Sequence, residues 1–414
     1  FFAVFLSSYM KPLEGVKVVD LSTYVAASSC GRMMADWGAD VIKVEAPSGD
    51  GYRKFGRAYK CPVDDDCNPL FDSLNANKRG IVINLKTEEG MAVMHKMLET
   101  ADVFLTNTRN QSLVPMGLDY ETLMKKYPRL VIANLSAYGE KGPEVNRPGY
   151  DTMSLWTRCG FTHDVSLINE GHYAPTLPLM GTGDIPVAMG LMAAINAALL
   201  AREKTGKGDR VALSLMGTGL WMGSQMIEST QFGHVYPKNR FTQSPVGAAY
   251  ECSDGTWFNC NVVNFPKDYP NFLRLMNHTE LLDDPLYNNR PNMNKPEIAE
   301  HLYKLFAAEF IKQPASYWKE QFELNDLCYE VVGTFRGALD DPTAWENDFL
   351  YKMKHDNGTE SVLVRPSMTS VNLGLPEYNR APKLGEHTKE VLAQYGYSEA
   401  EIDKMLADGA AVQR

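Results

Sequence analysis

Residues 16–45 read VKVVDLSTYVAASSCGRMMADWGADVIKVE, and the fold can be worked out from this stretch. Its β-branched runs at 16–21 and 41–45 predict two buried strands, while apolar residues at helical spacing over 30–37 predict a helix that ends at Gly38. The polar residues 22–29 are predicted to form a loop. A strand, a helix and a second strand in so short a stretch form a βαβ unit, which predicts an α/β fold with a parallel sheet.

The alternation of strands and helices continues after this unit. Strands are predicted at 80–85, 102–106, 130–135 and 210–215, and helices at 88–100, 119–126 and 185–202. Ligands of open α/β sheets bind outside the carboxyl ends of the strands. Those ends carry residues 24–26, 107–109 and 136–139, so we expect a site there. The G-x-G-x-x-G fingerprint is absent after the first strand, which argues against an NAD-dependent oxidoreductase.

A shift in composition divides the chain. Residues 10–225 are predicted to form a large Rossmann-like domain, residues 226–330 a small α+β domain, and residues 331–414 a return to the large domain. The last segment contains a predicted hairpin at 351–365 and a final helix, Ser398 to Asp408, which opens with a capping box of Ser398 and Glu401.

Composition excludes several classes of protein. A net charge of −10 argues against non-specific nucleic-acid binding. The seven cysteines form no C-x-x-C pair, which favours a reducing cytoplasm and predicts no metal site. Residues 1–9 are too short for a membrane span and lack a signal-peptide pattern, so we expect them to lie outside the fold. The apolar run 185–200 contains Pro186, Gly190 and Asn196 and is interpreted as a buried helix of a soluble protein.

Residues 146–156, NRPGYDTMSLW, contain the main candidate for chemistry. Pro148-Gly149 is a turn dipeptide ahead of an apolar run, so Asp151 is expected near the N-terminus of a helix. One interpretation is that Asp151 caps this helix, a role that aspartate fills well. The other is that its carboxylate is a nucleophile. The two roles are compatible.

Six passages in this order resemble the family III coenzyme A transferases, which include formyl-CoA and carnitine CoA-transferases. They are residues 12–21, 37–45, 75–80, 138–143, 147–151 and 201–208. The resemblance implies an interlocked-ring homodimer, a catalytic nucleophile at Asp151, an acyl-CoA and a carboxylic acid as substrates, and no cofactor. A carboxylate suits this chemistry because it is already ionised at neutral pH and can attack a thioester.

The resemblance also implies which residues bind CoA. Val25 and Ala26 match the positions whose backbone lies along the pantetheine arm, and Gly247 matches the family's glycine loop over the active site. The remaining expected CoA-binding residues are Asn77, Lys78, Arg79, Asn107, Arg109 and Tyr138. The alternative interpretation of the charged residues among them is that they are ordinary surface charges without a ligand. The chain departs from its relatives at Ala46-Pro47, where Arg53 is a possible substitute for a basic residue, and at Thr108 and Pro115.

Passages 117–123, 345–354 and 374–379 resemble, within this family, the enzymes of amino-acid-fermenting anaerobes that transfer CoA to 2-hydroxy acids such as phenyllactate and 2-hydroxyisocaproate. Aromatic residues would suit such acids, although they are also typical of a core; they are Tyr24, Trp156, Phe161 and Tyr173. An α-methylacyl-CoA racemase is the alternative function. Its matching aspartate follows a histidine, whereas this chain has Tyr150, which is no easy base near pH 7.

Overall fold

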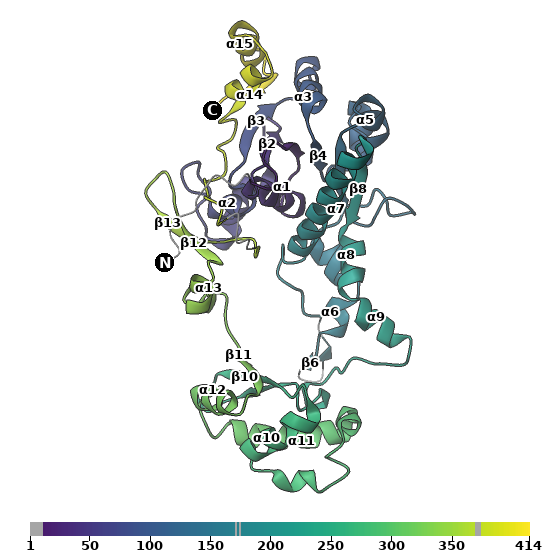
Figure 1. Ribbon diagram of the computed structural model, residues 1–414, viewed down its shortest axis with the longest axis vertical. Helices are drawn as coiled ribbons and strands as arrows, with labels where there is room; N and C mark the ends of the chain where they lie inside the picture. Colours follow the sequence, from purple (N-terminus) through teal and green to yellow (C-terminus); the bar gives the residue numbers. More distant parts are fainter. Residues whose placement is uncertain (1–10, 170–171, 174, 369–373) are drawn as a thin grey trace. The chain divides into compact units, whose positions relative to one another are not determined.

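The computed structural model describes residues 11–169, 172–173, 175–368 and 374–414 (Figure 1). The chain divides into two compact units. Unit 1 holds the residues up to Cys159, Leu177–Ile227 and Pro342–Arg414, and unit 2 holds Gly160–Thr176 and Glu228–Asp341. The three-part division expected from the sequence stays a prediction, and residues 1–9 lie outside the described residues.

Unit 1 contains a seven-stranded sheet in the order β14-β3-β2-β1-β4-β5-β8. The strands are β1 (Lys17–Leu21), β2 (Asp40–Glu45), β3 (Arg79–Ile83), β4 (Val103–Thr106), β5 (Val131–Ser136), β8 (Arg210–Ser214) and β14 (Ala411–Val412). All pair in parallel except β14, which runs antiparallel to β3. The predicted parallel α/β sheet is therefore confirmed, and its strand order is that of a doubly wound fold.

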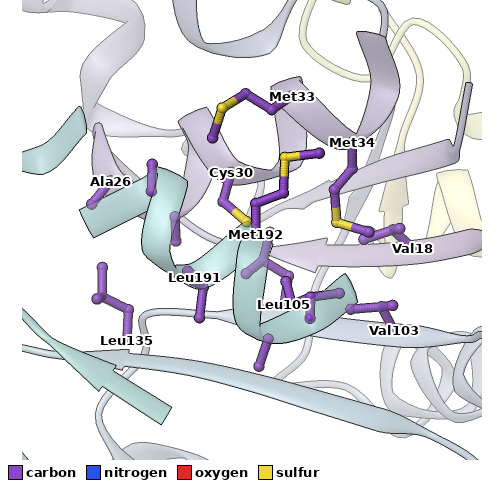
Figure 2. Packing of buried hydrophobic residues seen from close by; sticks show 14 of the residues in the cluster. Val18, Ala26, Cys30, Met33, Met34, Val103, Leu105, Leu135, Leu191 and Met192 are labelled. Atoms are coloured by element: carbon purple, nitrogen blue, oxygen red, sulfur yellow. The ribbon is translucent and has the colours of Figure 1, made fainter. Parts of the chain in front are cut away.

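Alternate residues of each strand face opposite sides of this sheet, as strand geometry requires. Val18 packs in one core cluster with helices α1 (Ala26–Asp36) and α7 (Asp184–Thr205), and its neighbour Val19 packs in another with α3 (Glu88–Thr100). Figure 2 shows the first cluster, where Cys30 of α1 and Met192 of α7 lie over Leu105 of β4. Helices thus cover both faces of the sheet, and its strands are apolar on both sides.

Further helices lie wholly or partly in unit 1. They are α2 (Pro69–Asn75), α4 (Asn110–Leu113), α5 (Tyr120–Lys126), α8 (Leu215–Met222), α9 (Ser224–Thr230), α13 (Pro342–Glu346), α14 (Thr388–Gln394) and α15 (Glu399–Ala407), with a 3-10 helix at Gly51–Tyr59. The loop predicted over 22–29 is wrong beyond residue 25, because Ala26 and Ala27 are buried in the core and Ser28 pairs with Ser22. The capping box of Ser398 and Glu401 is confirmed at the start of α15.

Helix α7 is long and apolar enough to cross a membrane by length and composition. Its residues Val187, Leu191 and Ile195 are fully buried against α1 and the sheet. The run predicted as a buried helix over 185–200 therefore serves as a core helix of unit 1.

Unit 2 is built on a three-stranded antiparallel sheet in the order β11-β10-β9. The strands are β9 (Ala249–Glu251), β10 (Trp257–Asn261) and β11 (Cys328–Val331), and the helices are α6 (Phe161–Asp164), α10 (Phe265–Leu275), α11 (Pro296–Phe310) and α12 (Ala315–Leu324). A two-stranded pair, β6 (Ile168–Asn169) and β7 (His172–Tyr173), also belongs to it. Aromatic rings fill its core, with Tyr250 stacked 4.6 Å from Phe310.

The last part of the chain returns to unit 1. β12 (Leu350–Lys354) and β13 (Glu360–Val364) form the predicted hairpin. Beyond it, α14 and α15 lie beside β3 in Figure 1, and β14 adds the antiparallel edge strand. Val391 and Ile402 of these helices complete the same core cluster as Val19.

Candidate active site

The carboxyl ends of β1 and β4 meet at the centre of the sheet. The chain leaves β1 toward the face covered by α1, whereas the helix residues after β4 pack on the opposite face. A crevice forms where neighbouring connections diverge in this way. A cavity of about 610 Å³ lies there, and its wall includes residues 23–26, 107–110, 134–137, 139–141, 147–150 and Asp184. The site predicted at the strand ends thus coincides with a cavity.

The loop after β1 is held rigidly against its neighbours. Tyr24 has a left-handed backbone, with φ 61°, and its N–H donates to Asp50 Oδ1 at 3.3 Å. The Thr23 N–H donates to Asn107 Oδ1 at 3.1 Å, and Asn107 Nδ2 returns a bond to the Thr23 carbonyl at 2.8 Å. This loop presents Val25 and Ala26 to the cavity.

Four of the expected CoA-binding residues line the cavity: Val25, Ala26, Asn107 and Arg109. The side-chain amide of Asn107 bonds the Thr23 backbone, so it holds the loop after β1 in place in the cavity wall. Arg109 is exposed, and among the described residues its guanidinium donates only to the Asn146 carbonyl, at 3.1 Å. Tyr138 lies beside lining residues, with the Arg147 guanidinium 4.9 Å from its ring centre.

Three further basic residues line the cavity that the sequence did not single out as ligands: Lys141, Arg147 and Arg210. Arg147 pairs with Glu144, and Arg210 pairs with Glu140. Lys141 has no ion pair within the part of the chain that the structure describes. Lys141 and Arg147 lie in passages that carry the family resemblance, and this was the sequence signal that could have identified them as cavity residues.

Residues 77–79 are absent from the cavity wall and have other partners. Lys78 is buried, and its ammonium donates to Asp20 Oδ2 at 2.8 Å, the Ser28 carbonyl at 2.8 Å and Asn75 Oδ1 at 2.9 Å. Burial lowers its pKa to about 8.

The neighbours of Lys78 are similarly engaged. Arg79 pairs with Asp40 and Glu390, while Asn77 bridges Asp36 and the Asn379 backbone. CoA contacts by residues 77–79 stay a prediction.

Gly149 lets the segment before Asp151 approach the end of β5. A Cβ atom at Gly149 would lie 2.9 Å from both Ala137 Cβ and Tyr138 Cε2. The segment then enters a short π-helix, Asp151–Thr157, whose first residue is Asp151. The helix start predicted from the sequence is confirmed, and Tyr150, not Asp151, occupies the cap position. The turn predicted at Pro148-Gly149 is wrong, because the turn lies at residues 143–146 and the chain from 147 to 150 is without regular structure.

The Asp151 side chain is fully buried at the edge of the cavity, beside the lining residues Tyr150 and Asp184. Its Oδ2 accepts the Gly181 N–H at 2.8 Å and the Gly183 N–H at 3.0 Å, and its Oδ1 accepts the Thr152 N–H at 2.8 Å. Backbone N–H groups aimed at one carboxylate oxygen form an anion cradle. A cap role alone does not account for amides contributed by a segment thirty residues away.

Asp184, the first residue of α7, places a carboxyl group in the wall of the cavity close to the buried Asp151. Burial raises the pKa of Asp184 to about 7, and the charge of Asp151 contributes to the rise. Their proximity could not be predicted from the sequence, because 33 positions separate the two aspartates.

Gly183 can be tested as a support of Asp151. A Cβ atom there would lie 2.8 Å from Trp156 Nε1 and 3.1 Å from Asp151 Cβ, so the Gly183 N–H must shift in Gly183→Ala. Misplacement of a reacting group by about 1 Å costs about a hundredfold in rate. We expect kcat to fall by about tenfold to a hundredfold with the fold retained, measured by steady-state kinetics and circular dichroism. Gly190→Ala, in the same helix and facing only the end of Leu213, is the control; an equal loss in both variants would contradict the cradle.

The other expected residues are dispersed. Arg53 pairs with Glu45 at 2.6 Å, so its guanidinium is engaged. Thr108 lines the cavity, and Pro115 does not. Gly247 belongs to unit 2, where a Cβ would meet nothing closer than 3.5 Å, so its role in an active-site loop stays a prediction.

The expected aromatic set is also split. Tyr24 lines the cavity and contacts Tyr150 edge-on at 5.8 Å, and Trp156 packs against the α1–α7 core cluster. Phe161 belongs to unit 2, and the Tyr173 side chain lies outside the described residues. Among the described residues, no group of three or more His, Cys, Asp or Glu side chains could hold a metal ion.

Comparisons with known proteins extend over nearly the whole chain. The model of "CoA-transferase family III" matches residues 13–388. The (R)-2-hydroxy-4-methylpentanoate CoA-transferase of Clostridioides difficile is 39% identical over 392 residues, which cover 94% of this chain and 97% of the relative. The cinnamoyl-CoA:phenyllactate CoA-transferase of Clostridium sporogenes is 38% identical over 399 residues, which cover 95% and 96%.

Among solved structures, a CAIB/BAIF family protein from Brucella suis aligns with a TM-score of 0.78 at 25% identity, covering 94% of this chain and 100% of the other. The residues that the family model matches include the segment with Asp151. The chain therefore belongs to CoA-transferase family III.

Proposed function

We propose that this enzyme transfers CoA from an acyl-CoA thioester to a free carboxylic acid, with Asp151 as the covalent nucleophile. The observation that carries the proposal is the Asp151 carboxylate in its cradle of Gly181 and Gly183 amides, at the edge of a cavity in a family III chain. Carboxylate side chains form covalent intermediates in other enzymes, which divides one difficult step into easier ones.

The steps balance without an added oxidant, reductant or metal. Asp151 Oδ1 attacks the thioester carbonyl, the C–S bond breaks, and a mixed anhydride and CoA thiolate form. The thiolate then attacks Asp151 Cγ, releasing the first carboxylate and leaving an aspartyl-CoA thioester. The acceptor carboxylate attacks Cγ and expels the thiolate, which attacks the acceptor's carbonyl carbon in the new anhydride. The acceptor leaves as its CoA thioester, and Asp151 is regenerated as a carboxylate.

The amide cradle suits every step at Asp151 Cγ. Oδ2 keeps its bonds to Gly181 and Gly183 when it becomes the carbonyl oxygen of the anhydride or thioester, and attack at Cγ places negative charge on that same oxygen. Preorganised N–H donors at such an oxygen are worth about 10²–10³ in rate. Because the carboxylate is fully buried, the side chains over it must move before a thioester carbon reaches Oδ1.

The cavity supplies the features that a CoA thioester needs. Val25 and Ala26 offer backbone beside which a pantetheine arm could lie, and Arg109, Lys141 and Arg147 offer cationic groups for phosphates. We assign the phosphate contacts to these three residues in preference to Lys78 and Arg79, because all three line the cavity and Lys78 and Arg79 do not.

We further propose an uncharged, hydrophobic 2-hydroxy acid as the acceptor. Its support is the activity of the two relatives at 38–39% identity, both of which are named for acids of this kind. A racemase is not favoured, because the relatives are CoA-transferases and Tyr150 precedes Asp151. The interlocked homodimer and the cytoplasmic location implied by the resemblance stay predictions.

A CoA-exchange panel tests this assignment. We expect kcat/KM for phenyllactate and 2-hydroxyisocaproate to exceed that for carnitine by about tenfold to a few hundredfold, because an apolar pocket gains about 25 cal/mol per Å² buried. Formate serves as a control for a small acid that fills no apolar pocket. A carnitine value equal to or above that for the 2-hydroxy acids would contradict the substrate assignment and leave Asp151 unaffected.

A further inference from the structure

Two acidic side chains stand at the same end of the cavity, and the steps above use only Asp151. Asp184 follows Gly183 directly, and the N–H of Gly183 holds Asp151 Oδ2. The Asp184 side chain lines the cavity, whereas Asp151 lies buried behind the wall. Within the described parts of the chain, the Asp184 carboxyl makes no hydrogen bond and no ion pair. A half-buried carboxyl group without a partner requires an explanation.

We propose that Asp184 is a further catalytic residue of this site, whose neutral carboxyl group donates a hydrogen bond to the thiolate or carboxylate that reaches the Asp151 end of the cavity. This inference rests on the proposed function, because it assumes that anions arrive and leave there. The proton stays on Asp184 throughout, so the transfer steps described above balance as before. An ionised Asp184 would instead repel every anion that the reaction brings to Asp151.

The surroundings of Asp184 favour the neutral form. Burial raises its pKa to about 7, and Asp151 adds to the shift. Tyr52 faces it from the 3-10 helix Gly51–Tyr59; burial first, then Tyr59 and Asp184, raise the pKa of Tyr52 to about 12. Tyr24 and Tyr150 line the same cavity, and the elements packed along α7 present Ala26 and Leu215 there.

Asp184→Asn tests the inference, because asparagine keeps a donor and cannot ionise. For the wild-type enzyme we expect kcat/KM to fall as pH rises through about 7, as the protonated fraction of Asp184 declines. For Asp184→Asn we expect a severalfold lower value near pH 6 and no decline up to about pH 9. Asp408→Asn, which removes an exposed charge at the end of α15, should keep the wild-type profile.

The outcomes separate this inference from the proposed function. An active wild-type enzyme whose alkaline decline persists in Asp184→Asn would overturn the role of Asp184 and leave Asp151 as the nucleophile. A wild-type protein that transfers no CoA at any pH would overturn both.

A second measurement does not depend on activity. The infrared difference spectrum of wild type minus Asp184→Asn should contain a protonated carboxyl band near pH 6 that is lost by about pH 9. Its absence near pH 6 would also overturn the inference.

Discussion

Asp151→Asn is expected to abolish CoA transfer, with a loss of more than about a thousandfold in kcat. Asparagine has the same shape, and its side-chain oxygen can still accept the Gly181 and Gly183 N–H groups that hold Oδ2. It cannot form an anhydride with a thioester, and no second nucleophile replaces it. Steady-state transfer assays with the purified variant measure the loss.

Two controls show that this loss is chemical. The variant should keep its circular dichroism spectrum and bind acyl-CoA, because Asp151 does not line the cavity in which we propose that CoA binds. Hydroxylamine in the presence of acyl-CoA should convert Asp151 of the wild type to a hydroxamate, detected by peptide mass spectrometry, and leave the variant unmodified. Retention of most of the activity in Asp151→Asn would disprove the assignment.

The sequence predicted the central fold well because that part depends on local patterns. The β-branched runs around Val18 and Val41 and the apolar spacing of α1 are readable within a few turns of chain. The antiparallel β14 was not predicted, since a two-residue strand gains its pairing only from β3, more than three hundred positions away. The start of α1 was missed for a similar reason, because the burial of Ala26 depends on α7.

In the candidate site, too, the residues with a local sequence signal could be predicted, and those brought in from distant segments could not. Asp151 could be singled out from its place ahead of an apolar run and from its family passage, but its cradle comes from Gly181 and Gly183 and its acidic neighbour is Asp184. None of these has a sequence signal that points to Asp151. The strand ends could be assigned to one edge of the sheet. Which basic side chains face the cavity could not be predicted, because it depends on ion pairs such as that of Lys78 with Asp20.

Lys78→Met is expected to lower the free energy of unfolding by about 3–5 kcal/mol, the usual cost of removing one partner of a buried ion pair. The Lys78 and Asp20 side chains are both 0% exposed, and the ammonium satisfies three acceptors beneath the loop after β1. Without the ammonium, the buried Asp20 carboxylate keeps, among the described residues, only the N–H and hydroxyl of Ser22 as donors. Urea denaturation at neutral pH measures the change.

The adjacent Arg79→Met is the matched control. Its pairs with Asp40 and Glu390 are partly exposed, and exposed pairs contribute about 1 kcal/mol or less. Asp20→Asn combined with Lys78→Met should cost less than the sum of the single changes, because both remove the same interaction. If Lys78→Met left stability unchanged and weakened only acyl-CoA binding, Lys78 would be a ligand of CoA as the family resemblance implies. The structure favours the opposite result, since an ammonium group with three internal acceptors and no exposed surface has no free donor for a phosphate.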